Sequence, residues 1–248
     1  MTSSAEVKRC RWKVNFSLTD KVLAKTIVDL PDIKLLTEVV RNNTYITAIE
    51  IATPELSFAE ATEFSSLAAN RCCDLISFVI GRGVSCTLQQ INEIGPPGAV
   101  KGGFKLFTVG TIIEAPKDFD LSTAPFLRVL EDEDQKLARQ LSHYRRGIAS
   151  LDIIEKVREF YQVLEDETGS QFKEKYQWLR DLVSHPELTR STASKQKATE
   201  RVRKTYVDLS SPRDIKTLQK QLEQIKLDAK MSLGRKLCLL SEEGIEKD

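Results

Sequence analysis

The chain has 248 residues, 41% of them apolar and 29% charged, a composition typical of a globular protein with one large or two small domains. Its 37 basic and 36 acidic residues give a net charge of +1, so overall charge favours neither a nucleic-acid coat nor an acidic ligand. The polar N-terminus and the lack of an apolar run of about 18 residues argue against a signal peptide and a membrane span, so we expect a cytoplasmic protein.

The N-terminal region shows the period of two that is typical of strands. Apolar and polar residues alternate over residues 12–18 and again over residues 45–51. Residues 84–94 and 104–113 are two further extended stretches, separated by the breaker Gly95-Pro96-Pro97-Gly98. These stretches predict a small antiparallel or mixed sheet.

A helix is predicted between the second and third of these strands. Ser57 and Glu60 have the spacing of a capping box, and the following apolar residues recur at helical intervals until Gly81. Gly81-Arg82-Gly83 superficially resembles a phosphate loop. However, no third glycine follows, and the order of helix then loop is opposite to that of a dinucleotide-binding turn, so we expect no nucleotide there.

After residues 114–125, which contain two prolines and are predicted to be a linker, the chain looks helical throughout. The expected fold class is α+β, with an N-terminal α+β domain at residues 1–120 and a C-terminal helical bundle at residues 126–248. Four helical faces are expected, the last of them long and amphipathic and better suited to core packing than to a free coiled coil. Their apolar residues are Leu137, Leu141, Tyr144 and Ile148; Ile153, Val157, Phe160, Tyr161 and Leu164; Phe172, Tyr176, Leu179 and Val183; and Ile215, Leu218, Leu222, Ile225 and Ala229.

The chemically reactive residues are few. The five cysteines are odd in number and lack metal-type spacing, so we expect reduced thiols, with a redox or metal role as the alternative. With only two histidines, His143 and His185, most metal sites and a Ser-His-Asp arrangement are disfavoured, and we expect neither a metal nor another cofactor. His143 is interpreted as an ordinary surface or interface residue. The cysteines are Cys10, Cys72, Cys73, Cys86 and Cys238.

His185 stands in a different context because Pro186 follows it. A proline disfavours the helical conformation of the preceding residue, so the third helix of the bundle should end near Ser184. Five residues of continuous helix advance by about 500°, which would place Arg180 and His185 roughly 140° apart, whereas a helix end allows them to converge. An arginine and a histidine could together cleave RNA without a metal, although such a pair also complements the dipole at many helix C-termini.

Three segments of the C-terminal half resemble the HEPN superfamily, and more narrowly the methylamine-utilisation J-type (MauJ-like) proteins. The likeness covers roughly 100 residues from Tyr144 onward, while the first 120 residues are similar only in general style. The segments are Tyr144-Arg145-Arg146-Gly147-Ile148-Ala149-Ser150, then Phe160-Tyr161-Gln162-Val163-Leu164-Glu165, and Trp178-Leu179-Arg180-Asp181-Leu182-Val183-Ser184-His185-Pro186.

The resemblance implies a metal-independent endoribonuclease with an Arg-x4-His motif. Arg180 would bind the scissile phosphate, His185 would exchange protons with the ribose 2′-hydroxyl or the leaving group, and Asp181 would orient one of them. Because the motif supplies one histidine per chain, it also implies a homodimer that brings two motifs into one cleft. Many members of the superfamily have no activity and serve as binding modules, so a non-catalytic protein that binds a partner protein or a nucleotide is the alternative.

A basic segment follows the motif. Residues 190–204 hold six basic residues against one acidic residue, Glu200, a net charge of +5 that could bind RNA phosphates. The competing interpretation is a solvated loop and helix face. Glu165 and Glu187 could place negative charge where RNA must enter, and in a third interpretation an unrelated adaptor binds a protein partner through its C-terminal helix. The basic residues are Arg190, Lys195, Lys197, Arg201, Arg203 and Lys204.

Overall fold

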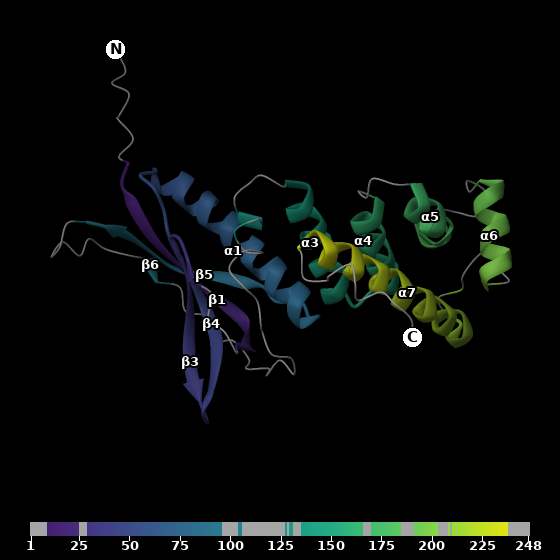
Figure 1. The fold of residues 1–248 in the computed structure, drawn as a ribbon, viewed down its shortest axis with the longest axis horizontal. Helices are drawn as coiled ribbons and strands as arrows, with labels where there is room; N and C mark the ends of the chain where they lie inside the picture. Colours follow the sequence, from purple (N-terminus) through teal and green to yellow (C-terminus); the bar gives the residue numbers. More distant parts are fainter. Residues whose placement is uncertain are drawn as a thin grey trace, which may run out of the picture. The chain divides into compact units, whose positions relative to one another are not determined.

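The computed structural model describes residues 9–24, 29–95, 104–105, 127, 129–130, 135–165, 170–184, 191–202, 208 and 210–237. The chain divides into two compact units, residues 1–133 and 134–248, which are considered separately (Figure 1). The predicted linker at residues 114–125 lies outside the described residues.

The first unit contains an antiparallel sheet with the strand order β2-β3-β4-β1-β5-β6. The strands predicted at residues 12–18, 45–51 and 84–94 are confirmed as β1, β4 and β5. Of the stretch predicted at residues 104–113, β6 accounts for the first two residues, and the rest lies outside the described part of the chain. The strands are β1 (Arg11–Leu23), β2 (Asp29–Leu30), β3 (Ile33–Val40), β4 (Asn43–Ala52), β5 (Cys86–Ile94) and β6 (Phe104–Lys105).

Helix α1 (Phe58–Ile80) runs across one face of this sheet (Figure 1). Its predicted capping box is confirmed: the Ser57 hydroxyl accepts from the Glu60 N–H, and the Glu60 carboxylate accepts from the Ser57 N–H. Gly81 ends the helix with φ 69°, a left-handed conformation that glycine adopts without steric cost. Val14, Phe16, Leu18 and Val22, which alternate with less buried residues along β1, lie in the core.

Strand β3 was not predicted. Its alternation is interrupted by an irregularity between Leu36 and Thr37, and Val39 is largely exposed, so its sequence lacks a clean period of two. A two-residue turn of Arg41 and Asn42, both with positive φ, connects β3 to β4, the geometry of a tight hairpin. The usual glycine signal of such a turn is missing here, which is why the sequence did not reveal it.

The second unit is helical in all the elements described. Helix α4 packs against three others, α3, α5 and α7, and α5 also packs against α6 (Figure 1). The predicted faces are confirmed, since the residues at their centres, such as Tyr144, Phe160 and Leu179, are buried. The helices are α3 (Gln135–Ala149), α4 (Ile153–Glu165), α5 (Ser170–Ser184), α6 (Thr192–Val202) and α7 (Pro212–Lys236).

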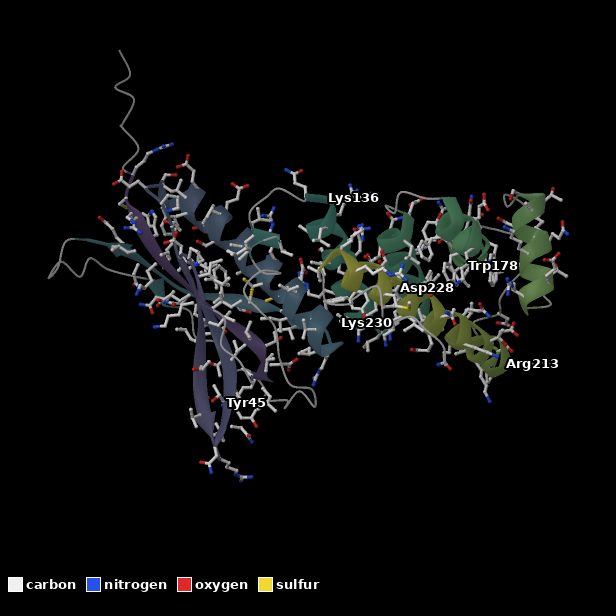
Figure 2. All side chains as sticks on the ribbon, in the orientation of Figure 1. Tyr45, Lys136, Trp178, Arg213, Asp228 and Lys230 are labelled. Atoms are coloured by element: carbon white, nitrogen blue, oxygen red, sulfur yellow. The ribbon has the colours of Figure 1, made fainter. Side chains whose placement is uncertain are left out.

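Helix α7 is the core-packing helix that its spacing predicted. Ser211 caps its N-terminus, Pro212 occupies the first turn, and Leu218 and Ile225 are completely buried. Asp228, labelled in Figure 2, accepts hydrogen bonds of 2.6 Å from both Tyr176 Oη and Lys175 Nζ, which ties α7 to α5. Burial and then this carboxylate raise the pKa of Tyr176, so its hydroxyl remains a donor.

The expected α+β class is thus found as an antiparallel sheet with its helix, followed by a helical region. None of the described helices combines the length and the apolar character that crossing a membrane requires.

Candidate functional site

Helix α5 carries Arg180 and Asp181 four and three residues before Ser184, its last described residue, so the helix end expected from Pro186 stays a prediction. His185, Pro186 and Glu187 lie outside the described residues. The convergence of Arg180 and His185 therefore stays a prediction, whereas the surroundings of Arg180 can be described in detail.

Arg180 is held between α4 and its own helix. Its guanidinium carbon lies 5.3 Å from the centre of the Tyr161 ring, a distance at which the cation is attracted by the aromatic face. Its Nη1 donates to Asp181 Oδ1 at 3.0 Å, and its Nη2 lies 4.0 Å from Glu165 Oε1. Because 29% of the side chain is exposed, the guanidinium is oriented by protein groups and still accessible to solvent.

Asp181 in turn is anchored to α6. Its residue exposure is 6%, and its Oδ2 accepts a 2.6 Å hydrogen bond from the hydroxyl of Ser194, which is equally buried. One oxygen of the carboxylate thus contacts Ser194 and the other contacts Arg180. This arrangement has the form expected of a positioning residue, because a short hydrogen bond to an ionised group fixes direction as well as distance.

Glu165 also has a defined position. Tyr161 Oη lies 3.4 Å from its Oε1, and Gln162 Nε2 donates to its Oε2 at 2.8 Å. Burial, with the negative charge of Glu165 as the next cause, raises the pKa of Tyr161 to about 12, although Arg180 opposes the change. The Tyr161 hydroxyl therefore keeps its proton near neutral pH and cannot serve as a general base there.

Arg158 is a second cation at the same end of α5, and sequence reasoning did not identify it. Its Nε donates to Ser184 Oγ at 3.0 Å, and its Nη1 lies 3.7 Å from Glu155. Arg158, Tyr161 and Glu165 are separated by three and four residues along α4, so they share one helix face. That spacing was the available signal, but nothing in the sequence showed that this face meets the end of α5.

The predicted RNA-binding residues are only partly described. Lys195, Lys197 and Arg201 lie on α6, while Arg190, Arg203 and Lys204 lie outside the described residues. Lys197 and Arg201 are exposed and Lys195 is half-buried, and Lys197 Nζ donates to the carbonyl of Glu174 at 3.1 Å. The buried side of α6 is formed by Ser194 and Ala198. An exposed cationic side of this kind suits both a phosphate-binding surface and a solvated helix face.

His143, interpreted as an ordinary surface or interface residue, lies half-buried where α3 contacts α4. Only 16% of its side chain is exposed, and its Nδ1 lies 2.7 Å from Glu159 Oε2. Arg146 Nε lies 3.4 Å from the same oxygen, so a histidine and an arginine one turn apart on α3 both contact a buried carboxylate of α4. A buried carboxylate needs such partners, and the sequence could not show that Glu159 is buried.

The four described cysteines form no disulfide. Cys72 and Cys73 are buried, Cys10 and Cys86 are half-buried, and Cys238 lies outside the described range. Burial is the main cause that raises the pKa of Cys72 to about 12, so its thiol remains protonated and unreactive at neutral pH. Within the part of the chain that is described, no group of three or more His, Cys, Asp or Glu is arranged to hold a metal ion.

The C-terminal part of α5 therefore presents an accessible, oriented arginine beside two carboxylates, five residues before His185 in the sequence. Comparison with known proteins adds no assignment to this geometry: the chain matches no family model, no curated protein and no solved structure.

Proposed function

We propose that the protein is a HEPN-like, metal-independent endoribonuclease in which Arg180 and His185 act on the scissile phosphate. The observation that carries the proposal is the fixed guanidinium at the end of α5. Ser194 holds Asp181, Asp181 holds Arg180, and Arg180 remains 29% exposed four residues before Ser184, the last described residue of the helix. A guanidinium fixed in this way could bind a phosphate without a large movement of the side chain. Enzymes use such pre-positioned groups to stabilise the negative charge that develops in the transition state.

In the proposed reaction the ribose 2′-oxygen attacks the neighbouring phosphorus. A new bond forms between them as the bond from phosphorus to the 5′-oxygen breaks, leaving a 2′,3′-cyclic phosphate and a 5′-hydroxyl. His185 takes the proton from the 2′-hydroxyl or gives one to the departing 5′-oxygen, and Arg180 neutralises the charge on the non-bridging oxygens. Because both proton transfers benefit from an imidazole, we propose a homodimer whose two motifs share one cleft.

The charges around Arg180 set a condition on this activity. Asp181 and Glu165 both lie near the guanidinium, so incoming RNA must compete with two carboxylates. Arg158 and the exposed cations Lys197 and Arg201 supply positive charge on the same unit. Since RNA binding through phosphates weakens as salt rises, cleavage should be strongest at low ionic strength.

The test is incubation of the purified protein with labelled single-stranded RNA in EDTA, beside Arg180→Ala, His185→Ala and the control Arg213→Ala. Arg213 is exposed in the first turn of α7, so its loss should leave activity unchanged. We expect cyclic-phosphate ends from the wild type and the control. Loss of one oxyanion-stabilising donor should lower the rate by about 100-fold or more in Arg180→Ala. Cleavage that persists in both active-site variants would contradict the proposal.

A second candidate, a non-catalytic HEPN-type module that binds a partner protein or a nucleotide, is favoured by one observation. Glu165 already lies 4.0 Å from Arg180 and is held there by Gln162, so the local charge is unfavourable to a polyanion. Glu165→Gln separates the two candidates. For an enzyme, removing this charge should increase RNA cleavage, whereas a binding module should show no cleavage either with or without the substitution.

A further inference from the structure

The first unit contains a pocket of about 330 Å³ between the sheet and α1. Ile33 of β3 and Ile51 of β4 contribute from the sheet, Phe64 and Leu67 from α1, and two helical leucines, Leu127 and Leu130, from the end of the unit. The volume lies at the lower end of the range found for small-molecule sites. All of these residues belong to residues 1–133, so the pocket is a property of this unit alone.

The pocket is apolar inside and accessible from solvent. Its lining residues Ile33 and Ile51 are buried, whereas Phe64 and Leu67 remain 46% and 53% exposed. Large apolar side chains are usually more buried than this in a folded protein, because burying one of them fully contributes roughly 1.5–3 kcal/mol to stability. Two such residues at the mouth of one pocket provide apolar contact area for a ligand.

Arg71 is the polar group that the pocket places among these apolar residues. It is half-buried on α1, and its Nη1 donates to the carbonyl of Leu130 at 3.2 Å, which fixes the guanidinium against another lining residue. The fork of a guanidinium matches a carboxylate, and the attraction between charges increases where water is excluded.

Asp32 lines the same pocket but is exposed. Its φ of 59° is uncommon for a residue other than glycine, and its carbonyl accepts from the Ala52 N–H at 2.7 Å, so the turn is fixed beside the pocket. A solvated carboxylate interacts weakly with a ligand in comparison with a half-buried guanidinium. Because the positive group, Arg71, is half-buried and the negative group, Asp32, is exposed, the pocket should bind an anion more strongly than a cation.

We propose that this pocket binds a small molecule with an apolar chain or ring and a carboxylate that pairs with Arg71. The apolar part occupies the space between Ile33, Ile51 and Phe64, and the carboxylate lies at the guanidinium. The pocket belongs to a different unit from α5, so the test of this proposal does not depend on the proposed ribonuclease activity.

Calorimetry on the full chain tests the proposal with three probes that share a ten-carbon chain: decanoate, decanol and decyltrimethylammonium. We expect saturable binding of decanoate with one site per chain and much weaker binding of the other two. A charge-assisted hydrogen bond contributes roughly 1.5–3 kcal/mol, so Arg71→Met should weaken decanoate binding by about tenfold or more and leave decanol unaffected.

Two further sets of variants keep the test valid if Arg71→Met disturbs folding. Ala68→Phe fills the pocket and should abolish decanoate binding, whereas Ala59→Phe, at an exposed position of the same helix, should preserve it. At the exposed lining position 67, Leu67→Glu should weaken decanoate binding and Leu67→Lys should not.

Equal binding of decanoate and decanol would overturn the proposal, as would decanoate binding that survives Ala68→Phe. Binding of none of the three probes would do so as well.

Discussion

Arg180 shows how one residue can be identified from sequence while its environment cannot. The Arg-x4-His spacing singled it out, and the structure places it on α5, four residues before the last described residue of that helix. In the structure it contacts Asp181, its neighbour in the chain, and Tyr161 and Glu165 on α4. The latter contacts depend on how α4 and α5 pack, which the periodicity of either helix alone does not specify.

The hydrogen bond between Ser194 and Asp181 gives a prediction at the same scale. Ser194→Ala removes a 2.6 Å donor from a buried carboxylate, so it should lower the free energy of unfolding by about 1.5–3 kcal/mol. Thr199→Ala is the matched control, because this exposed hydroxyl donates to the carbonyl of Lys195 on the same helix, and its loss should change stability by about 0.5 kcal/mol or less. Urea denaturation measures both, and equal stabilities would refute the anchoring role.

Among the elements, those defined by local signals were predictable and those defined by long-range pairing were not. Helix α1 carries its own start at Ser57 and its own stop at Gly81, so its boundaries could be predicted within a residue. Strand β3 exists because it pairs with β4 through a turn of Arg41 and Asn42, and neither its irregular alternation nor that turn is a strong signal.

The contact between α3 and α4 depends on a glycine. A Cβ at Gly147 would lie 2.9 Å from Cε1 of Phe160, whose ring is 1% exposed and packs edge-on against Tyr144. Gly147→Ala gains up to about 1 kcal/mol in helix propensity but overpacks the core by about 1–3 kcal/mol, so we expect a net loss of stability.

A double-mutant cycle with Phe160→Leu checks the cause of this loss. The smaller side chain makes room for the new Cβ, so the alanine substitution should be harmless or favourable in that background. A loss of the same size in both backgrounds would show that the clash with Phe160 is not the reason.

For the whole molecule, the two compact units each contain a buried core of their own. In residues 1–133 the core lies between the sheet and α1, with Ile49 and Leu75 fully buried. In residues 134–248 it lies among the helices, with Tyr144 and Ile225 fully buried. Along the sequence, a period of two gives way to a helical period, which is the local signal for two regions of different secondary structure. A domain that closes its own core can in general fold alone.

We therefore expect a fragment of residues 134–248 to unfold cooperatively, with a helical far-ultraviolet circular dichroism spectrum. Leu222→Ala should lower its free energy of unfolding by about 2–5 kcal/mol, because Leu222 is 6% exposed and its loss leaves a cavity. Leu227→Ala is the control on the same helix, since that side chain is half exposed and should contribute far less. A fragment without a cooperative transition would show that the helical unit needs residues 1–133 to fold.

If the fragment folds, RNA cleavage by it would localise the proposed activity to the helices. Decanoate binding should be lost in the fragment, because the residues that line the pocket lie in residues 1–133 and are absent from it.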